Sequence, residues 1–224
     1  MIAKVSEIVA KAMSVVFHPI FLPLYILVIY LMANPYQFGY SSPFEDVVFL
    51  VQTLFICVMM PLIAVFMMAR LNLVSSIHLT QRMDRIGPYI VTAIFYIWYY
   101  LNIQNYGVAL IFEIFILGSL ITLFLCFFIN NFFKVSMHSA GIASLIVNLA
   151  IANLAFEYGS ITWHQGGHFY YLPLAFVLVA TLIIGFLVVI SRFYLKSHSW
   201  LELFGGLLLG VAGQIFALKL VYII

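Results

Sequence analysis

The chain has 224 residues, of which 66% are hydrophobic and only 7% are charged. Soluble domains average about 45–50% apolar and about 25% charged residues, so these few charges would not solvate a soluble protein of this size. A mean hydropathy of +1.19 therefore indicates a chain that lives in a bilayer. This composition excludes soluble enzymes, disordered chains and nucleic-acid-binding proteins. The formal net charge of +2 is also too small to indicate an anionic polymer as partner.

The N-terminus is a short amphipathic stretch that is bracketed by Lys4 and Lys11 and lacks a small-residue cleavage site. We expect it to form an interfacial helix that leads into the first membrane span. A helix needs about 20 mostly apolar residues to cross the bilayer. The runs that qualify, or nearly do, are 16–34, 47–69, 87–103, 108–129, 139–156, 171–190 and 203–223. The sequence thus predicts an all-α, polytopic membrane bundle with six to seven transmembrane helices, folded as a single domain over residues 1–224.

Small residues recur in the last of these runs. Gly205, Gly206, Gly210 and Gly213 follow one another at three- and four-residue spacing in its first half. Such spacing is typical of membrane helices that approach a neighbour closely. We therefore expect the last helix to pack closely against a neighbouring helix.

Basic residues are distributed unevenly between the loops. Eight of the nine Lys and Arg residues lie at the N-terminus or in the second, fourth and sixth loops, which share one side of the membrane if there are seven spans. The positive-inside rule would place that side in the cytoplasm. A basic cluster kept for binding an anion would produce the same asymmetry, so the rule leaves the orientation open.

Three polar clusters lie on this charged side, and polar groups retained near hydrocarbon are functional candidates by default. They are residues 82–89 before the third span, 134–138 before the fifth, and 191–202 between the sixth and the seventh. Together they hold seven of the sixteen charged residues. The chemistry of the protein is expected to reside here.

The 191–202 cluster contains a histidine and an acid four residues apart. If residues 198–202 are helical, His198 and Glu202 share a face. The carboxylate would then accept the proton of one imidazole nitrogen and leave the other as an oriented nucleophile or base. Arg192 adds a planar donor fork suited to a phosphate. An interfacial loop that touches lipid headgroups, with a purely structural His198–Glu202 pair, explains the same residues as well.

The other two clusters add cations and a second histidine. Lys134, Ser136 and His138 lie within five residues before an apolar helix, and a helix start beside a cation is a ready anion site. His138 would there protonate a leaving oxygen. A polar helix cap with one topological lysine is the alternative. Arg82 and Arg85 are three apart and would point the same way on a helix, although a plain charge cluster is the favoured interpretation of that segment alone.

Taken together, two histidines, a supporting carboxylate and several cations on one membrane face suit one reaction. This is hydrolysis of a phosphate monoester or diphosphate through a phosphohistidine. One histidine attacks, the other protonates the leaving group, and the cations stabilise the equatorial oxygens. Such chemistry requires no metal and no cofactor.

The 191–202 cluster resembles a known signature. Ser191-Arg192, five residues, His198, three residues and Glu202 are similar to the third signature of the type-2 phosphatidic acid phosphatase superfamily, in which the acid is usually Asp. This match is the most specific of three. It places the histidine and the acid of the cluster in the order that the family uses.

Two weaker matches precede it in the order that the family has. Residues 136–138, Ser-Met-His, resemble a diverged second signature, Pro-Ser-Gly-His, with Val135 and Met137 in place of Pro and Gly. Residues 82–88 resemble a degenerate first signature, normally Lys, six residues and Arg-Pro. Here Pro88 follows Arg85 by three positions, and His78 occupies the lysine position. The three matches together span residues 82–202.

The resemblance implies an all-helical membrane lipid phosphatase without a metal. The implied site residues are the nucleophile His198, its orienting acid Glu202, the general acid His138 and the phosphate-binding Arg192, Arg85 and Ser136, to which charge and proximity add Lys134 and Arg82. The expected partners are membrane lipids and a lipid-phosphate substrate of the phosphatidic acid, phosphatidylglycerol phosphate, undecaprenyl diphosphate or lipid A type. No nucleic acid is expected, and the oligomeric state is not indicated.

Location and mechanism class follow from the same resemblance. Because members of the family often face the extracytoplasmic side, we favour that side of a bacterial cytoplasmic membrane for the site. A phosphotransferase would use the same residues. The alternatives are a non-catalytic relative that binds anionic lipid and a small-solute transporter that uses Glu113, predicted to lie mid-span in the fourth helix, together with His18 in the first.

Overall fold

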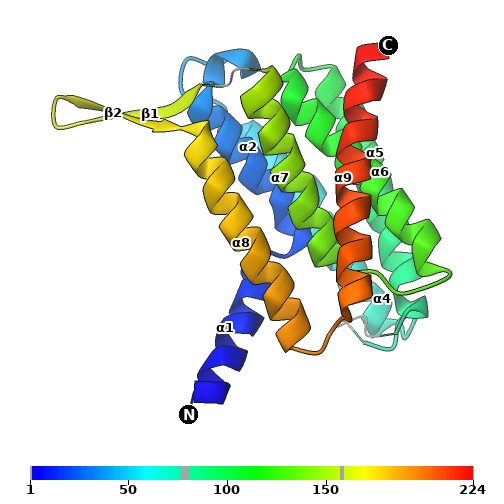
Figure 1. Ribbon diagram of the computed structural model, residues 1–224. Coiled ribbons are helices and arrows are strands. Elements are labelled where there is room, and N and C mark those ends of the chain that lie inside the picture. Colours follow the sequence, from blue (N-terminus) through cyan, green and yellow to red (C-terminus); the bar gives the residue numbers. More distant parts are fainter. Residues whose placement is uncertain (1, 77–80, 157–158, 224) are drawn as a thin grey trace.

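The computed structural model describes residues 2–76, 81–156 and 159–223, and its elements form a helical bundle with one small hairpin (Figure 1). Within these ranges, seven helical segments are long and apolar enough to cross a membrane. They are Val5–Ala33, Val47–Arg70, Met83–Gln104, Leu110–Asn130, Met137–Ala155, Leu174–Tyr194 and Trp200–Tyr222. The predicted all-α, polytopic bundle is confirmed. Most span ends lie close to the predicted ones, but the first span begins at Val5 and not at 16.

The first span is broken in its middle. Helices α1 (Ile2–Val16) and α2 (Leu22–Ala33) are separated by one 3-10 turn, η1 (Pro19–Phe21). Pro19 has no N–H and disfavours a helical conformation in the residue before it, so His18 is extended, with φ −65° and ψ 136°. Non-helical backbone at membrane depth is tolerated where it lines a cavity. The predicted N-terminal helix therefore exists as α1, and its interfacial location stays a prediction.

The remaining elements follow in chain order. They are η2 (Pro35–Phe38), α3 (Val47–Thr53), η3 (Leu54–Met59), α4 (Met60–Arg70), η4 (Met83–Arg85), α5 (Ile86–Gln104), α6 (Leu110–Asn130), α7 (Met137–Ala155), α8 (Leu174–Tyr194) and α9 (Trp200–Ile223). Elements α3, η3 and α4 form one continuous span, in which η3 is a π-helical stretch just before Pro61. Proline has no N–H to donate to the preceding turn, so Pro61 interrupts the α-helical hydrogen bonding at this point. The wider π-helical turn lies at this interruption.

A β-hairpin stands where the sequence predicted a loop and the start of the sixth span. Strand β1 (Ser160–Gln165) pairs antiparallel with β2 (His168–Pro173). Gly166 and Gly167 form the turn with φ values of 59° and 81°. A two-residue hairpin turn of this kind requires positive φ at both positions, which glycine adopts without strain. The sixth span consequently begins at Leu174 and not at 171.

Helix α9 packs most extensively against α6 and α7, beside which it lies in Figure 1. Its glycines permit the approach. A Cβ on Gly206 would collide with the Ser136 carbonyl oxygen, and one on Gly210 would collide with that of Ala140. The predicted close packing is confirmed, because only a residue without a side chain fits at these points. As a result, the start of α9 is held directly against the start of α7.

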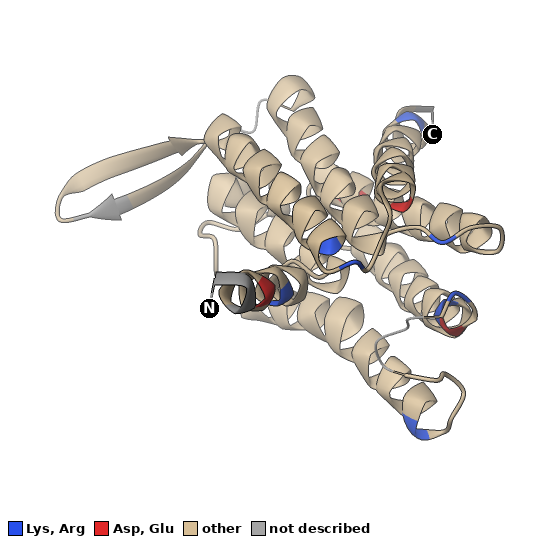
Figure 2. Cartoon of the chain, turned by 60° about the horizontal axis from the view of Figure 1, so that its bottom comes forward, with Lys and Arg blue, Asp and Glu red and all other residues tan. Residues whose placement is uncertain are grey.

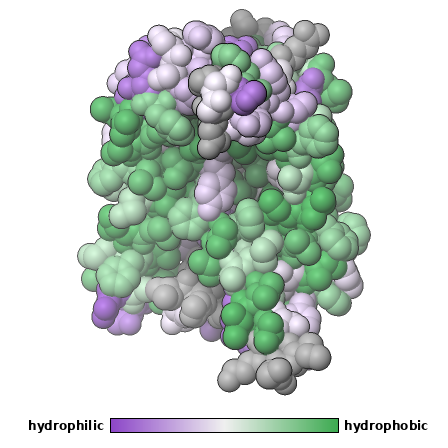
Figure 3. Space-filling model, turned by 90° about the vertical axis from the view of Figure 1, so that its left-hand side faces the viewer, coloured by the Kyte–Doolittle hydropathy of each residue, from purple (hydrophilic) through white to green (hydrophobic). Residues whose placement is uncertain are grey.

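The side of the bundle carries an apolar belt between two more polar ends (Figure 3). Large hydrophobic side chains are exposed on the helices, among them Phe186 at 66%, Leu208 at 69% and Leu154 at 85%. So much exposed hydrocarbon is stable only against lipid. The protein is therefore an integral membrane protein.

Candidate active site

The first and second polar clusters are joined by hydrogen bonds at one end of the bundle, where many of the Lys and Arg residues gather (Figure 2). The Nη1 group of Arg82 donates to the Phe132 carbonyl oxygen over 2.8 Å. The Nη1 group of Arg85 donates to the Val135 carbonyl oxygen over 3.0 Å. Both arginines thus reach the same loop, the one between α6 and α7.

The second and third clusters are joined in the same way. The Nζ group of Lys134 donates to the Ser197 carbonyl oxygen over 2.9 Å. The backbone N–H of Ser136 donates to the Glu202 carbonyl oxygen over 3.1 Å. Three segments that are far apart in the sequence therefore converge, as their shared side of the membrane predicted.

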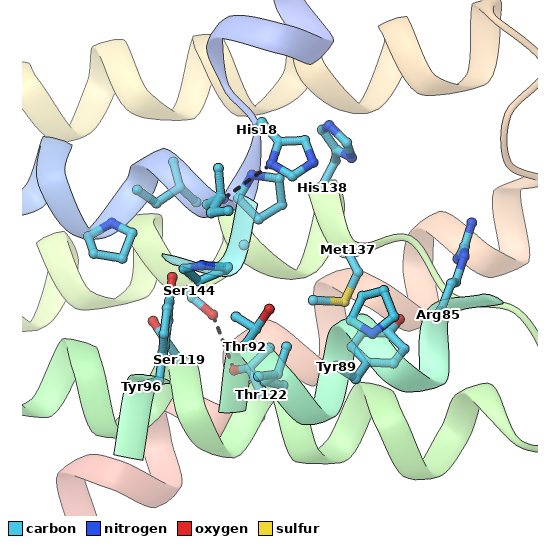
Figure 4. A pocket seen from close by; sticks show the side chains of 18 of the residues that line it. His18, Arg85, Tyr89, Thr92, Tyr96, Ser119, Thr122, Met137, His138 and Ser144 are labelled. Atoms are coloured by element: carbon cyan, nitrogen blue, oxygen red, sulfur yellow. Dashed lines mark hydrogen bonds between the residues drawn. The ribbon is translucent and has the colours of Figure 1, made fainter. Parts of the chain in front are cut away.

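A cavity of about 280 Å³ opens between these segments and runs into the bundle (Figure 4). Four predicted site residues line it, namely Arg85, His138, Arg192 and His198. They come from the start of α5, the start of α7, the end of α8 and the turn before α9. These predicted residues therefore contribute two guanidinium groups and two imidazoles to the cavity lining.

The predicted contact between His198 and Glu202 is present. The Nδ1 atom of His198 lies 2.6 Å from Oε2 of Glu202, and the His198 residue is 7% exposed. The prediction assumed that residues 198–202 are helical, but α9 begins only at Trp200. Ser199 caps the helix, because its hydroxyl accepts from the Glu202 N–H over 3.4 Å. Since a carboxylate only accepts, Nδ1 carries the hydrogen and Nε2 keeps its lone pair. His198 is thus oriented as a nucleophile or base.

Burial lowers the pKa of His198 from 6.5 to about 4. The hydrogen bond to Glu202 acts in the opposite direction, while the positive charges of Lys134, Arg85 and Arg192 lower this pKa further. At neutral pH the imidazole is therefore uncharged and its Nε2 lone pair is available. Burial and the Arg85 guanidinium also lower the pKa of Lys134.

Arg192 presents an unused donor in the cavity wall. It lies in the last turn of α8, and its Nε atom is buried without a hydrogen-bond partner among the residues that the structure describes. A buried donor without a partner is destabilising by about 1–3 kcal/mol, and more for a charged group. An anion's oxygen would supply the missing acceptor in a charge-assisted bond.

His138 lies in the first turn of α7 and pairs with the N-terminal segment. Its Nε2 atom is 2.9 Å from the Ser14 carbonyl oxygen. A carbonyl only accepts, so Nε2 carries a hydrogen in either charge state, and Nδ1 is the position that gains or loses a proton. This arrangement leaves Nδ1 as the atom that would exchange a proton with a substrate.

His18 is a cavity residue that the sequence analysis did not place in the site. Its ring lies against that of His138, with centroids 5.0 Å apart and planes at 88°, and both rings stand at one end of the cavity (Figure 4). The Nδ1 atom of His18 accepts from the Ile20 N–H over 3.3 Å, so its neutral form carries the hydrogen on Nε2. A histidine directly before a proline inside an apolar run was the signal, because such a pair breaks the span.

Two predicted phosphate binders stand behind the cavity wall. Ser136 is fully buried, and its hydroxyl accepts from the Ser139 N–H over 3.3 Å as the cap of α7. Arg82 is bonded to the 131–134 loop, and its own carbonyl accepts from the Asn130 side chain over 2.9 Å. Their positions match the helix-cap and charge-cluster alternatives. The His78 position lies outside the described residues.

Glu113 was predicted to lie in the middle of the fourth span. That prediction is wrong, because Glu113 occupies the first turn of α6. An acid in the first turn interacts favourably with the positive end of the helix dipole. The lining of the cavity, as far as the chain is described, does not include Glu113. Its position thus has a structural explanation that involves no solute path.

Comparison with protein-family models, with curated proteins and with solved structures finds no match for this chain. The family resemblance accordingly stays a prediction from three motifs.

Proposed function

We propose that the protein is an integral-membrane lipid phosphatase that works through a phosphohistidine at His198. One observation carries the proposal: a neutral imidazole, oriented through Nδ1 by Glu202, shares a cavity with Arg85 and Arg192 at the charged end of a membrane bundle. An oriented nucleophile beside two planar cations is what phosphoryl transfer requires, because catalysis there is mostly positioning and charge stabilisation.

Binding would place the phosphate against the two arginines. The unpartnered Nε donor of Arg192 and the guanidinium group of Arg85 would hold non-bridging oxygens. The hydrocarbon chains of the substrate stay in the bilayer or in the cavity. Lys134 is absent from the described lining of the cavity, but its positive charge acts on His198.

The reaction proceeds in two displacements. The Nε2 lone pair of His198 attacks phosphorus, the bond from phosphorus to the lipid oxygen breaks, and that oxygen takes the proton from Nδ1 of protonated His138. Glu202 stabilises the positive charge that the His198 ring acquires. Water then gives a proton back to His138 and attacks phosphorus, the phosphorus–nitrogen bond breaks, and inorganic phosphate leaves.

Release of inorganic phosphate tests the proposal. Purified protein in detergent, with EDTA, is offered phosphatidic acid, phosphatidylglycerol phosphate and undecaprenyl diphosphate. His198→Ala is expected to abolish release. His168→Ala, a matched histidine change on the exposed hairpin strand β2, is expected to leave it unchanged. Both variants must show the same size-exclusion profile as the parent.

Two outcomes would overturn the proposal. Release that survives in His198→Ala would remove the nucleophile from the account. Binding of these lipids to the parent protein without release of phosphate from any of them would instead favour the non-catalytic, anionic-lipid-binding alternative.

A further inference from the structure

The inner part of the cavity is lined by hydroxyl groups. They come from three helices and gather away from Arg85 in Figure 4: Thr92 and Tyr96 of α5, Ser119 and Thr122 of α6, and Ser144 of α7. A chamber that received only hydrocarbon would be lined with apolar side chains, because polar groups are costly inside a membrane protein unless they are paired. The hydrogen bonds of each hydroxyl therefore decide what the chamber accepts.

Two of the five hydroxyls are satisfied by the protein. The Thr122 hydroxyl donates to the Gly118 carbonyl oxygen over 2.8 Å, and the Ser144 hydroxyl donates to the Gly210 carbonyl oxygen over 3.3 Å. Bonding to the carbonyl four residues earlier is the ordinary solution for hydroxyls on helices of this protein. Other examples are Ser14 with Ala10, Thr53 with Phe49, Thr181 with Val177 and Ser191 with Leu187.

The other three hydroxyls depart from that pattern. Over the described part of the chain, Thr92, Tyr96 and Ser119 have no hydrogen-bond partner, although Tyr96 is only 5% exposed. Thr92 and Ser119 would need only to turn toward their own helix to be paired. All three line the cavity instead, so their hydroxyls are open to it and can bond to what enters. A ligand with hydrogen-bonding oxygens would supply the partners that the helices do not.

The depth of these hydroxyls in the cavity can be measured from Arg85 along α5. Thr92 follows Arg85 by seven residues and Tyr96 by eleven, which is about 10 Å and about 16 Å along the axis of α5. Side chains of a helix tilt toward its N-terminus, so the Tyr96 ring extends back toward the Arg85 end. With the phosphate at Arg85, the part of the lipid that follows the phosphate would extend toward these hydroxyls.

We propose that Thr92, Tyr96 and Ser119 form a subsite for oxygen atoms in the linkage between the substrate's phosphate and its hydrocarbon chains. This inference rests on the proposed function and narrows the substrate class. The substrate is a lipid phosphate with ester carbonyls or hydroxyls just below the phosphate, as in a glycerolipid. A polyprenyl diphosphate, whose chain is bare hydrocarbon beyond the phosphates, would leave all three hydroxyls unpaired.

Binding measurements on the His198→Ala protein test the inference without turnover. The probes are dioleoyl phosphatidic acid, its di-O-oleyl ether analogue without carbonyl oxygens, and a polyprenyl monophosphate. The ester is expected to bind at least tenfold more tightly than either other probe. Adding Thr92→Val, Tyr96→Phe and Ser119→Ala should reduce this preference to within twofold while affinity for the ether is kept.

A matched control separates the subsite from a general loss of hydroxyls. Thr181→Val removes a buried hydroxyl that is bonded to its own helix outside the cavity, and it should leave the ester preference unchanged. Melting temperatures in detergent must agree across the variants. The ratio of kcat/KM for ester and ether substrates in the protein with intact His198 is expected to follow the same order.

Each contrary result has a distinct meaning. Equal affinity for ester and ether, tighter binding of the polyprenyl probe, or a preference that survives the triple change would each overturn the subsite and leave the lipid phosphatase untouched. Failure of every lipid phosphate to bind would overturn the proposed function and the subsite with it.

Discussion

Replacing Glu202 by Gln tests whether the His198–Glu202 pair has a catalytic role. The change keeps an acceptor for the Nδ1–H group of His198 but removes the negative charge. In the parent protein the Nδ1 atom lies 2.6 Å from Oε2 of the carboxylate. A hydrogen bond to a charged group contributes about 1.5–3 kcal/mol and a neutral one about 0.5–1.5 kcal/mol. The difference of about 1–2 kcal/mol corresponds to a loss of about 5- to 30-fold in kcat/KM. Glu202→Ala, which also leaves Nδ1–H unpaired, should lose more.

The pH profile distinguishes this role from a merely structural one. The carboxylate raises the pKa of His198 against the lowering effect of burial. Its removal should therefore move the acid limb of kcat/KM further below about 4. Phosphate release is measured on parent and variants with equal melting temperatures. A suitable control is Glu7→Gln, because Glu7 also pairs with a base four residues away, at 2.6 Å, but on the exposed face of α1.

Two results would refute this reasoning. A Glu202→Gln protein within twofold of the parent at every pH would mean that the charge of the carboxylate contributes nothing to the reaction. An equal loss in Glu7→Gln would mean that the effect is not specific to the site.

Three further predictions concern the cations and the packing around the site. Lys134→Met removes a positive charge that lowers the pKa of His198, so the acid limb of the activity profile should move up from about 4 toward 6.5. A pH profile of Lys134→Met that equals that of Lys134→Arg would contradict this. Arg192→Ala should lower kcat/KM by about 10- to 150-fold, because one charge-assisted hydrogen bond of about 1.5–3 kcal/mol is lost. Arg192→Lys should recover only part of this kcat/KM, and full recovery would mean that the planar donor fork of arginine has no role. Gly210→Val should lower the melting temperature, because overpacking costs about 1–3 kcal/mol of stability. Leu208→Val, on the lipid-facing surface, should not lower it. Equal melting temperatures of the two variants would refute the close contact at Gly210.

Span positions and the convergence of the polar clusters were predictable from the sequence. Hydropathy fixes the spans because only apolar helices are stable in hydrocarbon. The pairing of His198 with Glu202 followed from their four-residue spacing, even though α9 begins only at Trp200. Loops on one side of a membrane lie near one another in a small bundle. That is why Lys134 and Arg85 were predicted to approach the third cluster.

Other features depended on tertiary structure that no local pattern records. The position of His18 beside His138 follows from the path of a broken span across the bundle. Thr92 and Ser119 carried no signal, because a hydroxyl on a helix is usually paired with its own backbone. The hairpin had a local signal in Gly166-Gly167 between two runs rich in β-branched and aromatic residues. Hydropathy of the neighbouring span concealed it.

Isolation of a phosphoenzyme tests the central claim most directly. The protein is mixed with a lipid phosphate carrying a radioactive phosphoryl group and quenched with denaturant within milliseconds to seconds. The account predicts a protein-bound label that is labile to acid and stable to alkali, that maps to the peptide containing His198, and that is absent from His198→Ala. Phosphate release by the parent protein with no such label, or with a label on another residue, would contradict the account.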